Sequence, residues 1–185
     1  MAAHLLFCTA SEAKPFIYKA MDVKIPGTDQ SWFNLVETRA DPENGDHFKR
    51  ELKTDEEFGT EFIGASEKEC QDWAMEMQGR HNFIGQDLIA IADARSASDD
   101  TLLMQFYGRK PDNDDTEREP WPQENDSWHS YRVDYREAHK VIASFDEGDF
   151  DAIYPVYFGR KEELTDENGV FDVARAESIC SGKES

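Results

Sequence analysis

The sequence predicts a single α/β domain of the α+β type, in which two or three helices pack on a mixed sheet of five or six strands. Residues 87–93 and 101–107 are short apolar runs, typical of central strands that are buried on both faces. Residues 130–135 alternate between apolar and polar side chains, as in a half-buried strand. Only residues 94–100 separate the two apolar strands, too few for a crossover helix. We therefore expect these two strands to form an antiparallel central pair.

Two helices are marked by local signals. Ser66 and Glu69 form a capping box, which satisfies free amide groups at a helix start, and Gly79 is placed to end that helix in a left-handed cap. A second helix repeats its apolar residues at positions i, i+3, i+4 and i+7, and Gly148 ends it. The two apolar stripes are Cys70, Trp73, Ala74 and Met77, and Ala138, Val141, Ile142 and Phe145.

Weaker patterns predict the remaining elements. Pro155 would confine any strand that contains it to a sheet edge. The expected elements are strands at 16–23, 58–63 and 150–158, a short helix at 46–53, and a helix or strand at 31–38.

The chain of 185 residues fits one domain, 1–185. Residues 109–127 are polar and interrupted by prolines, which predicts a long loop. Asn168 and Gly169 indicate a turn. Residues 177–185 are expected to form a loose C-terminal tail.

Charge is the strongest global feature of the sequence. Forty acidic residues against twenty basic ones give a formal net charge of −20. Such a surface repels nucleic acid and anionic lipid, so we expect neither a nucleic-acid nor a membrane partner. Solubility is the ordinary reason for this charge, and a cationic partner or mimicry of a polyanion is the sharper alternative.

The cysteine pattern and the chain start favour a cytoplasmic protein. Cys8, Cys70 and Cys180 are far apart and form no C-x-x-C pair, as expected for free thiols in a reducing compartment. The short apolar run 5–8 has no preceding lysine or arginine, unlike a signal peptide. No apolar run approaches the roughly 20 residues of a membrane helix.

The sequence contains none of the glycine-rich nucleotide motifs, and neither H-E-x-x-H nor G-x-S-x-G. We therefore expect no cofactor and no metal. Acidic residues gather at 112–117 and 146–151, but their spacing is not that of a calcium loop. A solvated loop and a charged helix end are the favoured interpretations.

Four local features carry a resemblance to a known family. They are DLIAIADARS at 87–96, TLLMQFY at 101–107, SYRVDY at 130–135 running into a helix, and DENGVF at 166–171. Over residues 58–173 the chain resembles an uncharacterised family of bacterial and fungal proteins, known only as a domain of unknown function (number 6924). The resemblance implies a compact α/β domain and provides no activity or catalytic residue.

Asp93 and Arg95 follow a predicted strand, where ligand-binding groups often lie. A carboxylate and a guanidinium in this place suit a polar substrate or proton transfer. The alternative is an aspartate that caps a turn and a surface ion pair.

A second group of candidates surrounds the strand at 130–135 and the next helix start. Histidine is suited to proton transfer near neutral pH, and tyrosine and tryptophan offer an apolar wall with polar tips. The alternative is a structural role, because the alternation places Tyr131 and Tyr135 on the core face. The group comprises Trp128, His129, Tyr131, Arg132, Tyr135 and His139.

Trp121 lies between Pro120 and Pro122 in the predicted loop. An aromatic side chain held in a polar loop could close a pocket, dock a partner or attach the loop to the domain.

These features favour a small cofactor-independent enzyme or binding protein that acts on a small organic molecule by acid–base chemistry, as an isomerase, cyclase or hydrolase. Its pocket would be lined by aromatic residues and closed by the 109–127 loop. The alternative is a non-catalytic acidic interaction module, inhibitor-like or immunity-like, that binds a basic partner. The candidate residues are Asp93 and His129 for catalysis and Arg95, Trp121, Trp128, Arg132 and Tyr135 for substrate binding.

Overall fold

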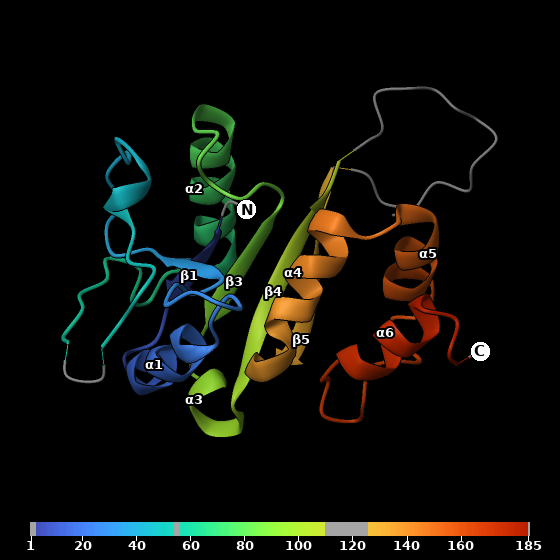
Figure 1. Ribbon diagram of the computed structural model, residues 1–185. Helices are drawn as coiled ribbons and strands as arrows, with labels where there is room; N and C mark the ends of the chain where they lie inside the picture. Colours follow the sequence, from blue (N-terminus) through green and yellow to red (C-terminus); the bar gives the residue numbers. More distant parts are fainter. Residues whose placement is uncertain (1–2, 54–55, 110–125, 185) are drawn as a thin grey trace.

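A computed structural model describes residues 3–53, 56–109 and 126–184. One five-stranded mixed sheet runs through the molecule in the order β2-β1-β3-β4-β5 (Figure 1). Strand β1 pairs in parallel with β2 and β3, whereas β3–β4 and β4–β5 are antiparallel. The predicted mixed sheet with its antiparallel central pair is therefore confirmed. The strands are β1 His4–Cys8, β2 Phe33–Leu35, β3 Leu88–Ala92, β4 Thr101–Gly108 and β5 Ser127–Asp134.

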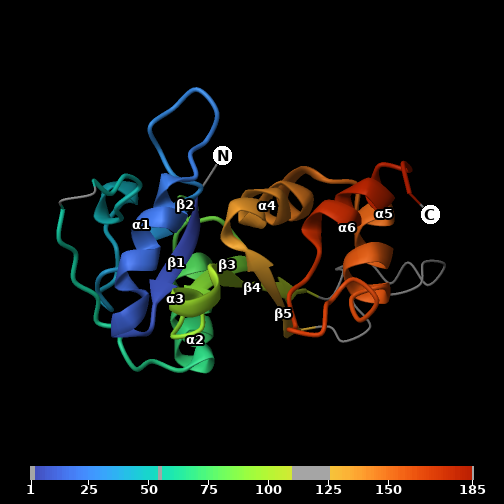
Figure 2. The same ribbon diagram turned by 90° about the horizontal axis from the view of Figure 1, so that it is seen from below.

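Helices cover both faces of the sheet, which explains the continuous apolar run of β3. Alternate residues of this strand enter different cores, with Ala90 on one face and Ile89 on the other. Helices α1 (Lys14–Asp22) and α4 (Ala138–Glu147) lie on the first face, and α2 (Glu67–Arg80) lies on the second (Figure 2).

Helices α2 and α4 form where the sequence predicts them. The Ser66 hydroxyl accepts a hydrogen bond from the Glu69 amide, and the Glu69 carboxylate accepts one from the Ser66 amide. Gly148 follows the last residue of α4, as predicted. The predicted cap at Gly79 is wrong: α2 continues to Arg80 and ends at His81, whose backbone is extended.

The C-terminal part adds helices to the α4 face. Helix α5 (Phe150–Tyr154) continues into a π-helical turn at Pro155–Gly159, and α6 (Val173–Cys180) packs beside them. Aromatic rings join this layer to the sheet, with the centroid of Tyr131 lying 5.8 Å from that of Tyr157. Because α6 extends to Cys180, the first residues of the expected 177–185 tail are helical.

Three predicted strands are wrong. Residues 16–22 of the strand predicted at 16–23 belong to α1, whose buried Phe16, Ile17, Ala20 and Met21 share one helical face rather than alternating. Residues 58–63 form a loop and turn, and the Gly64 amide donates to the Thr9 carbonyl. Residues 150–158 are helical. Pro155 is tolerated there because it occupies the first turn of the π-helical segment, where its missing N–H costs little.

Two further elements differ from expectation near the N-terminus. Strand β1 is not among the predicted elements, although its five residues are all buried, as are those of β3. The helix expected at 46–53 is reduced to a 3-10 turn at Gly45–His47. The following residues extend along β2, where the Leu35 amide donates to the Lys49 carbonyl at 2.9 Å and the Ser31 amide donates to the Arg50 carbonyl at 2.7 Å.

The other outer strand of the sheet is also contacted by the chain itself. The Phe171 amide donates to the carbonyl of Arg132 on β5 at 2.7 Å. Phe171 follows the turn predicted at Asn168 and Gly169, and Gly169 has the left-handed backbone that this turn requires, with a φ of 74°. None of the helices in the described ranges has the length and apolar character of a membrane span.

Candidate functional site

The structure joins two of the predicted site residues, Asp93 and Arg132. Asp93 follows β3 and accepts two hydrogen bonds from the Arg132 guanidinium, at 2.9 Å and 2.5 Å. The amide and hydroxyl of Ser96, at the start of α3 (Ser96–Asp99), also donate to this carboxylate. The Arg132 side chain is 11% exposed and that of Asp93 is 30% exposed, so the pair is partly removed from water.

Burial raises the pKa of Asp93, but the hydrogen bonds and charge of Arg132, together with the donors of Ser96, outweigh this effect and hold the pKa below its usual range. A carboxylate with a lowered pKa is a weak base. The geometry thus suits Asp93 for attaching the turn after β3 to β5, while its predicted catalytic role stays a prediction.

Arg95 and Tyr135 also make contacts within the fold. Arg95 donates to the Asp99 carboxylate at 2.6 Å and to the Asn168 carbonyl at 2.7 Å. The Tyr135 ring lies edge-on to Phe16 of α1, with 5.6 Å between centroids. Each of these side chains links separate segments around the end of the sheet.

The predicted cluster around β5 is divided between the two faces of the sheet. His129 shares a face with Tyr131, and its ring lies 4.8 Å from that of Phe158. Trp128 is on the opposite face, where it packs against Tyr107 with 5.3 Å between centroids. The structure therefore does not bring His129 to Asp93. Trp121 and most of the predicted 109–127 loop lie outside the described residues.

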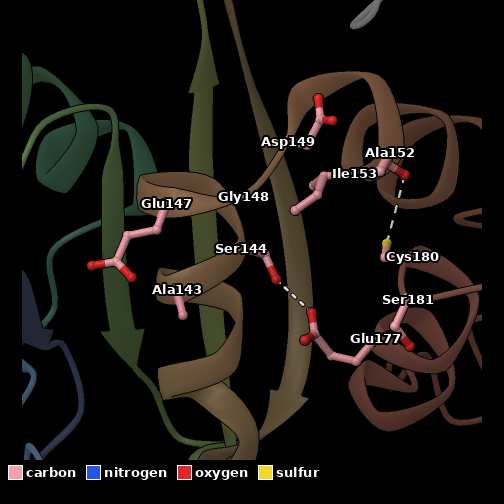
Figure 3. Close-up of a pocket in the computed structure, with 10 residues that line it drawn as sticks. All are labelled: Ala143, Ser144, Glu147, Gly148, Asp149, Ala152, Ile153, Glu177, Cys180 and Ser181. Carbon is pink, nitrogen blue, oxygen red and sulfur yellow. Dashed lines mark hydrogen bonds between the residues drawn. The ribbon is translucent and has the colours of Figure 1, made fainter.

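A hollow of about 320 Å³ lies between α4, α5 and α6, and we call it the α4–α6 hollow (Figure 3). Ser144 of α4 and Glu177 of α6 point toward each other across it, whereas the Glu147 carboxylate points away from α6. The apolar stripe of α4 faces the sheet, which leaves Ser144 beside the C-terminal helices. The hollow is lined by Ala143, Ser144, Glu147, Gly148, Asp149, Ala152, Ile153, Glu177, Cys180 and Ser181.

A hydrogen-bonded network of three side chains forms one wall of the α4–α6 hollow. The Ser144 hydroxyl donates to Glu177 Oε1 at 2.5 Å, and the Tyr157 hydroxyl donates to the same oxygen at 3.3 Å. The two hydroxyls are 3.2 Å apart. Tyr157 is fully buried behind the other two residues, so only Ser144 and Glu177 face the hollow.

Burial raises the pKa of the Tyr157 phenol, and this effect outweighs the lowering effect of the neighbouring Ser144 hydroxyl. The phenol therefore stays protonated and keeps its donor for Glu177. Burial, and then the negative charge of Glu177, also raise the pKa of the Cys180 thiol. Cys180 accordingly remains a thiol at neutral pH, with Sγ 3.6 Å from the Ala152 carbonyl oxygen.

Sequence reasoning did not identify Ser144, Tyr157 or Glu177 as site residues. Ser144 and Glu177 are 33 positions apart, and no short motif links the three. The one available signal is that Ser144 lies next to the apolar stripe of α4, and a serine within a helix is often structural.

The described parts of the chain contain no group of three or more histidine, cysteine, aspartate or glutamate residues placed to hold a metal ion. Comparison with known proteins adds no relative, since no family model, curated protein or solved structure matches this chain.

Proposed function

We propose that this protein is a small cofactor-independent enzyme that binds a small organic molecule in the α4–α6 hollow and moves a proton on it. Glu177 is the proton acceptor. The observation that carries the proposal is the placement of this carboxylate at the wall of an open hollow, held by two hydroxyl donors.

A general base must reach its substrate and keep a fixed orientation. Ser144 and Tyr157 supply the orientation, because both bind one oxygen of Glu177. The other oxygen, Oε2, receives no hydrogen bond from the described residues and is the one available to a substrate. Tyr157 acts through Glu177 and is a positioning residue.

The reaction class that fits one carboxylate without a cofactor is proton transfer next to a carbonyl group. Glu177 takes a carbon-bound proton, the electron pair of that C–H bond moves into an enolate, and the same carboxyl group returns the proton to a neighbouring atom. Atoms and charge balance within the substrate and Glu177. The substrate class is therefore a small carbonyl compound with an acidic C–H bond.

Two broader assignments accompany this proposal. Cys8, Cys70 and Cys180 are all free, which supports a cytoplasmic location. The net charge of −20 supports a small-molecule ligand over nucleic acid. Membership of the family of unknown function noted above remains a proposal based on its four sequence features.

Deuterium exchange tests the proposed base. The protein is incubated in D₂O with dihydroxyacetone and with pyruvate, and loss of the carbon-bound protons is followed by proton NMR. We expect exchange above the buffer rate with the natural chain, and a rate at least about 10²-fold lower with Glu177→Gln. Glu43→Gln is the matched control, because it removes an equal charge from an exposed glutamate that does not line the α4–α6 hollow. Exchange at the buffer rate, or equal rates in Glu177→Gln and the natural chain, would reject the proposal.

A further inference from the structure

A second hollow, of about 220 Å³, lies on the other side of α5, between this helix, the last turn of α4 and strands β3 and β4. We call it the aromatic hollow. It shares no residue with the α4–α6 hollow. It is lined by Gln86, Asp87, Leu88, Phe106, Phe145, Asp146, Phe150 and Tyr154.

Four aromatic rings form the wall of this hollow. Phe106 and Phe145 stack at 4.2 Å between centroids, and Tyr154 meets Phe106 edge-on at 6.2 Å. Phe150 lies 5.0 Å from Tyr154 and is 53% exposed, the highest exposure among the large hydrophobic side chains of the described residues. Packing in the core does not explain a phenylalanine at this exposed position, and its ring extends the aromatic wall to the surface.

Two carboxylates face the same space. Asp146 accepts a hydrogen bond from His4 at 2.9 Å through Oδ2, and Asp87 accepts one from Arg109 at 2.5 Å through Oδ1. Both side chains remain 27% exposed. Within the described ranges no group donates a hydrogen bond to Asp146 Oδ1 or Asp87 Oδ2, so each carboxylate has an oxygen available to a ligand.

The Tyr154 phenol remains neutral between these groups. Burial raises its pKa, and the negative charge of Asp87 raises it further. A neutral phenol ring keeps its electron-rich face and adds no charge of its own.

This combination selects a positively charged organic group. Aromatic faces attract cations, and the two carboxylates add direct charge complementarity. No lysine, arginine or histidine side chain lines the hollow itself, and the two basic side chains that pair with its carboxylates, Arg109 and His4, each bind one oxygen and leave the other to a ligand. We propose that the aromatic hollow is a binding site for a small organic ammonium ion.

The same residues do not suit a metal ion. Hard cations such as calcium take six to eight oxygen ligands. Here two carboxylates stand beside four rings, and the described residues hold no cluster of three or more metal-ligating side chains. An ammonium ion, by contrast, gains from every ring it contacts.

Choline and its neutral carbon isostere, 3,3-dimethylbutan-1-ol, test the proposal because they have nearly the same shape and differ in charge. Isothermal titration calorimetry should show saturable binding of choline and at least about tenfold weaker binding of the isostere. Equal affinity for both compounds, or no binding of choline up to about 10 mM, would overturn the proposal.

Variants locate the site. Asp87→Asn and Asp146→Asn should each weaken choline binding about tenfold, while Glu147→Gln, which removes an equal charge next to Asp146 but outside the aromatic hollow, should leave it unchanged. If all three variants weaken binding equally, only the overall charge matters and the site is rejected.

An exposed ring provides a variant that does not depend on the ion pair with His4. Phe150→Ala should weaken choline binding severalfold without lowering the melting temperature of the protein. Ile63→Ala is its control, because Ile63 is also an exposed hydrophobic residue, at 39%, and lies away from the hollow. Unchanged choline affinity in Phe150→Ala would contradict the proposed site. Glu177→Gln should bind choline normally, so this test is independent of the proposed enzyme.

Discussion

Arg132 on β5 and Asp93 after β3 are joined by two hydrogen bonds, although β4 lies between their strands. In the sheet register, Ile91 and Arg132 both stand opposite Leu103 of β4. The ion pair therefore passes over the central antiparallel strand and connects two strands that share no backbone hydrogen bond.

We expect Arg132→Ala to lower the free energy of unfolding by about 2–3 kcal/mol, because the Asp93 carboxylate would stay partly buried without its cation. Urea denaturation measures this change. Arg136→Ala is the control, since Arg136 pairs with Asp134 at the surface, where water screens the ion pair, and its loss should change the free energy of unfolding much less. An equal loss of unfolding free energy in the two variants would show that the Asp93–Arg132 pair contributes no more to stability than a surface ion pair.

The same pair predicts a dependence of stability on pH. The folded pKa of Asp93 is lowered, so its contribution is complete above about pH 4 and is lost as the pH falls through the folded pKa. In Arg132→Ala the raising effect of burial remains without the cation, so the pKa of Asp93 should move upward. NMR titration of the Asp93 carboxyl in both proteins measures this directly. A pKa that stays in place after the substitution would contradict the assigned cause.

Two glycines should respond in opposite directions to alanine. A Cβ at Gly148 would lie 2.1 Å from Ile153 Cδ1 and 2.4 Å from the Ser144 carbonyl oxygen, so Gly148→Ala should cost about 1–3 kcal/mol of stability. A Cβ at Gly79 would meet nothing within 4 Å inside α2, and Gly79→Ala should add about 0.5–1 kcal/mol. Thermal melts of the two variants test both signs. A stabilised Gly148→Ala protein would show that the end of α4 can shift.

The elements that the sequence predicts correctly are those with local signals. The capping box at Ser66 and Glu69 acts within one turn of α2, and the antiparallel β3–β4 pair follows from the short connection alone. The strand predicted at 16–23 fails for the opposite reason. Its apolar residues are compatible with a strand or with a helix, and their packing with residues of β1 and β3 in one core favours the helix α1.

The candidate sites depend on contacts that no local pattern contains. Asp93 and Arg132 were assigned separate roles in catalysis and binding, and their pairing across 39 positions becomes visible only in the sheet. Side chains of a strand alternate between its two faces, so His129 and Arg132, three positions apart on β5, lie on opposite faces. The alternating sequence pattern already implies this separation. Phe150 and Asp146 enter the aromatic hollow through the packing of α5 beside α4, whereas the sequence places Asp146 in an acidic helix end and Phe150 in a predicted strand.

The outer strands of the sheet have a consequence for self-association. An open strand edge offers amide and carbonyl groups to which another chain can add as an extra strand, the usual route to fibrils. Here residues 49–50 occupy the β2 side, and Phe171 occupies the carbonyl of Arg132 on the β5 side. Each outer strand therefore has some of its edge groups hydrogen-bonded by another segment of the same chain. Each edge group that is bonded in this way is no longer available to pair with a strand of another molecule.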